Sequence, residues 1–324
     1  MSFQRESAGK SARTKESDSL TVGNPRLPFS AIFLFISVFI GNCVSADPLY
    51  LWYTSRGETE MYLLGSIHVL SEDFYPLPDY IEALARHADV LVLEADIREE
   101  NLNSEEIAQL TMEKGFYHDG SSIKDHLEKS LYQSLAVAVK KAGLSMERIS
   151  LMKPWLLSLT LQNLELEALG FSSDSGMEQV LIEAFTRDEV VELEGFEYQL
   201  ELIAGLGEDE QIELLESAVN GFGRMKEGLE ILIDAWKLGS PELIAEELAL
   251  EGLSEGITER LLLQRNISMA EQAAELLNTE AGKQTILFVV GAAHFTGETG
   301  IPSLLSSRGY SVRQVDNRGE FILR

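Results

Sequence analysis

The distribution of hydrophobic residues predicts β-strands near both ends of the chain and helices between them. Two β-rich runs, residues 49–53 and 60–67, are separated by Ser55-Arg56-Gly57-Glu58, a segment typical of a hairpin turn. Residues 90–93 form a short, continuous apolar run that ends at Glu94, as in a strand buried on both faces of a parallel sheet. Further strands are predicted at residues 189–193, 284–290 and 311–315.

Residues 78–88 have apolar side chains at helical spacing, and Pro78 suits the first turn of a helix. With strands 60–67 and 90–93, this helix predicts a β-α-β unit with a right-handed crossover. The chain between about residues 104 and 277 is mostly amphipathic helix. The helices predicted there are 130–142, 153–169, 177–186, 198–206, 208–238, 241–250 and 254–277, and one more is predicted near 301–308.

These elements predict an α/β fold with a mostly parallel central sheet. The sheet is built from N- and C-terminal segments, because strands occur at both ends of the chain beyond residue 46. A large helical insertion, about residues 104–277, separates the two groups of strands. We therefore expect a single domain over residues 47–324.

The first 46 residues resemble a signal peptide. A polar, basic segment precedes the apolar run 27–44, and Val44-Ser45-Ala46 supplies small residues for cleavage. The prediction is a protein exported to the periplasm or secreted, with no membrane contact after cleavage. The alternative is an uncleaved membrane anchor formed by residues 27–44, a run that approaches the lower length limit of a membrane span.

Charge and cysteine content narrow the classes of function. The chain carries 53 acidic against 26 basic side chains, a net charge of −27. Five basic and three acidic residues lie in the first 46, so subtracting their +2 leaves −29 on the remainder. Such acidity disfavours nucleic acid as a partner and can concentrate divalent cations. The single cysteine, Cys43, lies in the leader, so a metal in the mature chain must rely on nitrogen and oxygen ligands.

Two segments share the pattern Gly-x-x-His at the end of an apolar strand. One runs from Gly65 to His68 and the other from Gly291 to His294, while Glu94 ends a third apolar strand. Ligands of open α/β sheets bind beyond the carboxyl ends of the strands, where glycine permits a close approach. Two imidazoles and a carboxylate converging there suit a divalent metal with open positions.

Structural roles are the alternative for each of these residues. A histidine at a strand end is commonly a hydrogen-bonding residue, and Glu94 is also suited to cap a helix or to pair with Arg265. The repeated motif together with the strand-terminal glutamate favours a shared functional site. The other histidines are interpreted as structural: His87 within a helix, and His118 and His126 on either side of a turn.

The residues LLGSIHVL (63–70), ADVLVLEAD (88–96) and ILFVVGAAHFTGETGIPSLLSSRGYSV (286–312) resemble the TraB/GumN family, which includes the Tiki-type metalloproteases. Other matching features are Asp174-Ser175-Gly176-Met177-Glu178, Val191-Glu192-Leu193-Glu194 followed by Gln199, and Gln264-Arg265-Asn266-x-x-Met269. The resemblance covers about residues 49–316. It implies an α/β fold related to the haem-binding ChaN-like and the erythromycin-esterase-like proteins.

The resemblance also implies divalent-metal-dependent peptide hydrolysis, and it carries over to His68, His294 and Glu94. One departure is Glu178, where the family pattern leads us to expect aspartate. The expected cofactor is a divalent cation (zinc, manganese or cobalt), and the expected substrate is a peptide or a small molecule. Such a cation would polarise a scissile carbonyl and lower the pKa of a water molecule.

Two catalytic roles are predicted beside the metal ligands. Glu94 would be the general base if it is not itself a ligand. Arg265 would steady a substrate carboxylate or a developing oxyanion, or would form a structural ion pair. No Gly-x-Ser-x-Gly elbow surrounds Ser66 of the first motif, which disfavours a serine hydrolase, and the sequence has no His-Glu-x-x-His helix, which disfavours a common zincin.

Two other classes of function remain as alternatives. A metal-independent hydrolase would use a histidine and a glutamate in acid–base roles, as the erythromycin-esterase resemblance suggests. A non-enzymatic protein would keep the fold and the histidines to bind iron or haem, or to regulate another protein.

Overall fold

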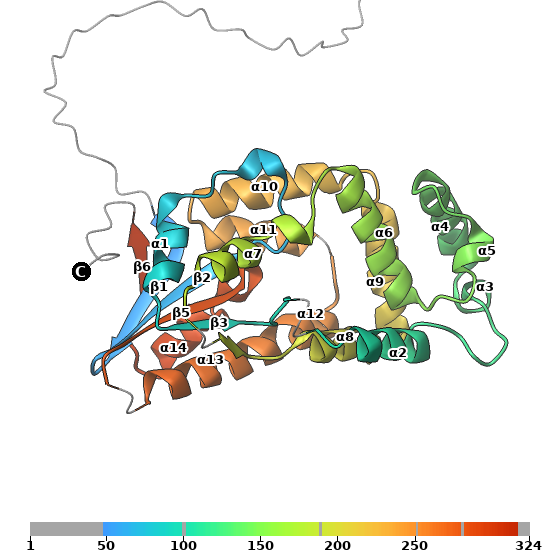
Figure 1. The fold of residues 1–324 in the computed structure, drawn as a ribbon. Helices are drawn as coiled ribbons and strands as arrows, with labels where there is room; N and C mark the ends of the chain where they lie inside the picture. Colours follow the sequence, from blue (N-terminus) through green and yellow to red (C-terminus); the bar gives the residue numbers. More distant parts are fainter. Residues whose placement is uncertain (1–47, 99–101, 188–189, 251, 280–281, 317–324) are drawn as a thin grey trace, which may run out of the picture. The chain divides into compact units, whose positions relative to one another are not determined.

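A six-stranded mixed sheet is the central element of the fold (Figure 1). The computed structural model describes residues 48–98, 102–187, 190–250, 252–279 and 282–316. The order of strands across the sheet is β4-β3-β5-β2-β1-β6. The strands are β1 (Pro48–Arg56), β2 (Thr59–Ser66), β3 (Val90–Leu93), β4 (Val190–Glu192), β5 (Gln284–Gly291) and β6 (Arg313–Asp316). The predicted α/β class and mostly parallel sheet are confirmed.

The C-terminal strand β5 lies between the two N-terminal strands β2 and β3. It pairs in parallel with both, placing Ser66 beside Gly291 and Leu93 beside Val289. β1 pairs antiparallel with β2 and β6, and β4 pairs in parallel with β3 at the other edge. The carboxyl ends of β2, β5 and β3 therefore lie next to one another, although their residues are far apart in the sequence.

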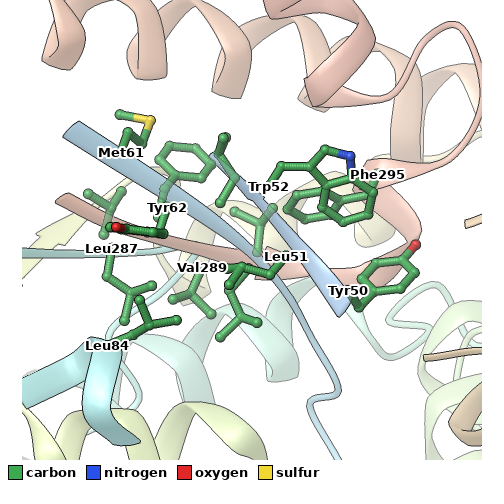
Figure 2. Packing of buried hydrophobic residues seen from close by; sticks show 14 of the residues in the cluster. Tyr50, Leu51, Trp52, Met61, Tyr62, Leu84, Leu287, Val289 and Phe295 are labelled. Atoms are coloured by element: carbon green, nitrogen blue, oxygen red, sulfur yellow. The ribbon is translucent and has the colours of Figure 1, made fainter. Parts of the chain in front are cut away.

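Helices cover both faces of the sheet. Figure 1 shows α1 (Asp79–His87) and α7 (Met177–Ala184) on one side, and α13 (Gln264–Leu277) and α14 (Ile301–Ser307) on the other. In Figure 2, Leu84 of α1 lies next to Leu287 and Val289 of β5. Trp52 of β1 stacks on Phe295, with ring centroids 4.9 Å apart. Burial of these apolar side chains is the main stabilising contribution to the sheet layers.

The helical segment between β3 and β5 contains a second hydrophobic core. Its buried side chains come from α3 (Ile123–His126), α4 (Lys129–Lys141), α5 (Met146–Ile149), α6 (Pro154–Ala168) and α9 (Glu208–Gly221). The remaining helices of this segment are α2 (Ser104–Lys114), α8 (Phe196–Ala204), α10 (Met225–Lys237), α11 (Pro241–Leu250) and α12 (Glu255–Thr258). The segment also contributes α7, α13 and β4 to the sheet layers, so it is only partly separate from the sheet.

Two helix predictions need correction. Residues 208–238 do not form one helix, because Gly223 adopts a φ of 89°, a left-handed conformation that separates α9 from α10. Residues 254–277 contain a π-helical turn, η3 (Glu259–Leu263), between α12 and α13. Short 3₁₀ helices occur at η1 (Glu72–Phe74), η2 (Ser173–Ser175) and η4 (Ala292–Phe295).

The predicted leader, residues 1–46, lies outside the described residues. Its cleavage, and the alternative of an anchor at residues 27–44, therefore stay predictions. Within the part of the chain that the structure describes, no helix has the length and apolar character needed to cross a membrane.

We predict that Gly65→Ala destabilises the fold by about 1–3 kcal/mol, as overpacking of a dense core does. A Cβ atom at Gly65 would lie 2.3 Å from Cδ1 of Tyr50, whose side chain is buried and cannot move aside. Gly221→Ala is the control, because a Cβ atom there meets no atom within 4 Å. Chemical denaturation of both variants measures the free energy of unfolding, and equal values for the two would contradict this packing account.

Candidate metal centre

Three predicted site residues meet beyond the carboxyl ends of β2, β3 and β5. His68 follows β2, Glu94 follows β3 directly, and His294 lies in η4 after β5. Oε1 of Glu94 lies 3.9 Å from Nε2 of His68 and 3.5 Å from Nε2 of His294. The structure therefore brings together the three side chains that the sequence analysis singled out, and both imidazoles present the same ring nitrogen to one carboxylate oxygen.

The two motif glycines permit this close approach. A Cβ atom at Gly291 would lie 2.7 Å from Nε2 of His68 and 3.3 Å from Oε1 of Glu94. At Gly65, it would collide with the ring of Tyr50, whose hydroxyl donates a hydrogen bond to the carbonyl of Ala292 at 2.9 Å. The glycines are thus required by packing within the site.

The other ring nitrogen of each histidine has its own oxygen partner. Nδ1 of His68 lies 2.7 Å from Oε1 of Glu178, which also accepts a hydrogen bond from the hydroxyl of Ser66 at 2.5 Å. Nδ1 of His294 lies 2.5 Å from Oδ1 of Asn266. Because carboxylate and amide oxygens only accept, each Nδ1 donates its hydrogen. Partners of this kind orient metal-ligating histidines in many proteins.

Glu94 is held by hydrogen bonds to both carboxylate oxygens. The amide of Gly291 donates to Oε1 at 2.6 Å. Arg265 donates to Oε2 at 2.6 Å, and Gln199 donates to the same atom at 2.9 Å. The Glu94 side chain is only 8% exposed, so these bonds compensate the burial of its charge.

Arg265 forms the structural ion pair that was one of its two predicted roles. Its Nε donates to Oε1 of Glu194 at 2.9 Å, and its Nη2 to Oε2 of Glu194 at 2.8 Å as well as to Glu94. Nη1 donates to the carbonyl of Leu261 at 3.1 Å. Each guanidinium nitrogen therefore has a protein acceptor. A role of Arg265 toward substrate stays a prediction.

The two histidines differ in protonation. The negative charge of Glu178 raises the pKa of His68 to about 9. Burial lowers the pKa of His294 to about 4, although the charge of Glu94 opposes this shift. The side chain of His68 is 56% exposed and that of His294 is 4% exposed. Without a metal, His294 is therefore neutral at pH 7, and the site is open to solvent on the side of His68.

Both carboxylates beside the histidines are ionised at neutral pH. Burial acts to raise the pKa of Glu94, but the charges of His294, His68 and Arg265 together lower that pKa to about 2. Burial likewise acts to raise the pKa of Glu178, but the charge of His68 and its hydrogen bond outweigh burial and lower that pKa. The site therefore combines two carboxylates with a buried, neutral imidazole at His294 and an exposed, protonated imidazole at His68.

The donor set fits a divalent cation. Two ligand atoms of a tetrahedral ion, with bonds of about 2.1 Å, lie about 3.4 Å apart. The separations of 3.5 and 3.9 Å between Glu94 and the histidines are close to this value. Among the described residues, no group of three or more His, Cys, Asp or Glu side chains is arranged so that it could hold a metal ion. Holding an ion at His68, Glu94 and His294 would therefore require these side chains to move.

The other histidines lie outside this cluster. His87 and His118 contact the carbonyls of Ala83 and Met112, at 2.7 and 3.0 Å, and His126 is bound to Ser121 and Glu208. His118 and His126 line a hollow of about 590 Å³ in the helical segment. None of the five residues of the strand-end cluster (His68, Glu94, Glu178, Asn266 and His294) lines that hollow. We place the candidate site at the strand ends, where the titratable groups converge.

The sequence analysis did not assign roles to Glu194, Gln199 and Asn266. All three stood within segments that matched the family, but a single sequence does not show which partner a helix or loop residue meets. Glu194 follows the edge strand β4, Gln199 lies on α8 and Asn266 on α13. The sequence signal that could have assigned Asn266 to the site was its position next to Arg265, for which a catalytic role was predicted.

We predict that Arg265→Met destabilises the protein by about 3–5 kcal/mol, because it leaves two buried carboxylates without their cation. The side chains of Glu94 and Glu194 are 8% and 5% exposed. Arg86→Met is the control, since its pair with Glu82 is solvent-exposed and contributes less than about 1 kcal/mol. Denaturant unfolding distinguishes the two, and a loss below 1 kcal/mol for Arg265→Met would contradict the account.

We predict that the metal-free protein loses stability as pH falls from 6.5 toward 4. The pKa of His294 is about 4 in the folded protein and about 6.5 in the unfolded chain, so unfolding takes up a proton in this window. The stabilisation is fully present above pH 6.5, and its loss by pH 4 is about 3 kcal/mol. His294→Gln removes this contribution. An unchanged pH slope of the unfolding free energy in that variant would contradict the assignment.

Comparisons with known proteins agree with the resemblance seen in the motifs. The chain is 24% identical over 262 residues to the uncharacterized protein YbaP of Escherichia coli (strain K12), covering 79% of this chain and 93% of YbaP. YbaP of Shigella flexneri gives the same identity and coverage. A metalloprotease TIKI homolog of Amphimedon queenslandica is 34% identical over 76 residues, 23% of this chain and 15% of that protein.

No solved structure gives a significant match to the chain. The model of the TraB/PrgY/gumN family matches residues 50–314, which include strands β2 to β5 and every residue of the candidate site. On this evidence, the chain belongs to the TraB/PrgY/gumN family.

Proposed function

We propose that this protein is a divalent-metal-dependent hydrolase that acts on peptide or related amide bonds. One observation carries the proposal: Nε2 of His68 and Nε2 of His294 both face Oε1 of Glu94, at 3.9 and 3.5 Å. Both Nδ1 atoms are occupied by other acceptors. The partial similarity to a TIKI metalloprotease homolog supports the same class of chemistry.

A neutral His294 leaves the lone pair of Nε2 facing a carboxylate oxygen, and these two electron-rich atoms repel each other. A cation between these two atoms would remove the repulsion, because it would be attracted to both the nitrogen and the carboxylate oxygen. His68, His294 and Glu94 would hold the cation, and nitrogen and oxygen ligands suit zinc, manganese or cobalt. A bound cation would polarise a scissile carbonyl and lower the pKa of a water molecule.

Glu94 fits the role of a ligand better than that of a general base. Its pKa of about 2 is far below the value near 7 that suits a base at neutral pH. Arg265 and Gln199 hold Oε2, so the carboxylate is oriented with Oε1 toward the histidines. Arg265 therefore acts here by fixing Glu94.

Substrate would approach from the exposed side of His68, because His294 and Glu94 are almost fully buried. The acidic body of the protein favours cationic metals and disfavours nucleic acid. Export directed by the leader would place this activity in the periplasm or outside the cell, on a peptide or small-molecule substrate.

The experiment is metal analysis together with a peptide hydrolysis assay. We expect the wild-type protein to bind about one zinc, manganese or cobalt ion per chain, as a single three-ligand site does, and to lose activity on chelation. His68→Ala and His294→Ala should lose both the metal and the hydrolysis. His118→Ala is the matched control and should retain both, because His118 lies outside the cluster.

Three outcomes distinguish the alternatives. If the wild-type protein binds none of the three metals when they are supplied in excess, the metal-dependent proposal is wrong. Hydrolysis that survives chelation but not His68→Ala would favour the metal-independent acid–base alternative. A Soret band after incubation with haem, without hydrolysis, would favour the non-enzymatic haem-binding alternative.

A further inference from the structure

Asn266 contacts the ring nitrogen of His294 that does not face Glu94. We propose that Asn266 is a positioning residue that selects the tautomer of His294, with hydrogen on Nδ1 and a lone pair on Nε2 beside Glu94. The consequence of this tautomer for metal binding rests on the function proposed above. The tautomer itself is a property of the metal-free protein and is tested separately.

The orientation of the Asn266 amide follows from its second partner. Nδ2 of Asn266 donates to the backbone carbonyl of Thr299 at 2.9 Å. A carbonyl oxygen only accepts, so the NH₂ group of Asn266 must face Thr299 and Oδ1 must face His294. Oδ1 also only accepts, and therefore the hydrogen between the two side chains belongs to Nδ1 of His294. The chain of donors and acceptors thus allows one assignment.

Two acceptors compete for the single hydrogen of the neutral imidazole. Nδ1 lies 2.5 Å from the Asn266 oxygen, whereas Nε2 lies 3.5 Å from Oε1 of Glu94. The longer distance lies outside the usual range of an N–H···O bond. Oε1 of Glu94 already accepts a hydrogen bond from the amide of Gly291 at 2.6 Å. Without Asn266, the charged Glu94 would attract the hydrogen to Nε2 and close the position where a cation would bind.

Two neighbouring residues of one helix hold Glu94 and His294, the two side chains that face each other. Arg265 binds Glu94 and Asn266 binds His294, and both lie in the first turn of α13. Asn266 is 2% exposed, and Met269 and Ala270 on the same helix are fully buried, so α13 is anchored against the sheet layers. The π-helical turn η3 immediately precedes this pair, and Leu261 within it accepts from Arg265. Such turns are frequent at functional sites.

The experiment is long-range ¹H–¹⁵N NMR of the full chain with labelled histidine, recorded at pH 7 with chelator. We expect His294 to carry its hydrogen on Nδ1 in the wild-type protein. In Asn266→Leu, the hydrogen should move mainly to Nε2. In Asn266→Asp, which keeps an oxygen acceptor, it should stay on Nδ1. Asn278→Leu changes an exposed asparagine at the end of the same helix and should leave the tautomer unchanged.

A metal titration of the same proteins gives the second readout. We expect Asn266→Leu to weaken zinc or cobalt binding about 10–100-fold, as loss of a partner behind a ligating histidine does, and Asn266→Asp to restore most of the affinity. The proposal is overturned if wild-type His294 carries its hydrogen on Nε2, a result that needs no variant to fold. It is also overturned if Asn266→Leu leaves the tautomer unchanged. The expected tautomers without metal binding by the wild-type protein would support the role of Asn266 and reject the proposed function.

Discussion

The parallel pairing of β5 between β2 and β3 is the constraint on which the rest of the structure depends. Its register places Ser66 beside Gly291 and Leu93 beside Val289. Two histidine motifs that are more than 200 positions apart in the sequence therefore end at the same edge of the sheet. The meeting of His68, Glu94 and His294 at one edge of the sheet follows from this register.

The helical segment between these strands supplies the groups that hold the site together. α13 brings Arg265 to Glu94 and Asn266 to His294, α7 brings Glu178 to His68, and α8 brings Gln199 to Glu94. These contacts hold the two imidazoles and the Glu94 carboxylate in their orientations. In this organisation, the burial of charged and polar groups is compensated by paired charges and directed hydrogen bonds.

Much of this arrangement was predictable from the sequence, because strand periodicity and strand-end motifs are local signals. The strands β2, β3 and β5 and the residues His68, His294 and Glu94 were predicted on that basis. The break near Gly223 was missed, since the apolar spacing of residues 208–238 continues across it and only the backbone conformation reveals it. The partners Asn266, Glu194 and Gln199 depend on how helices dock, which no local pattern specifies. Their roles emerged only from the three-dimensional contacts, whereas the ion pair of Arg265 with Glu94 had been predicted as one of its two roles.

The central claim is that His68, His294 and Glu94 together hold one divalent cation. The most direct measurement is a crystal structure of the zinc- or cobalt-loaded protein with anomalous data at the metal edge. The account predicts a single anomalous peak bonded to Nε2 of both histidines and to Oε1 of Glu94. A structure in which the gap between these atoms stays empty at saturating metal, or in which the metal binds elsewhere, would contradict it.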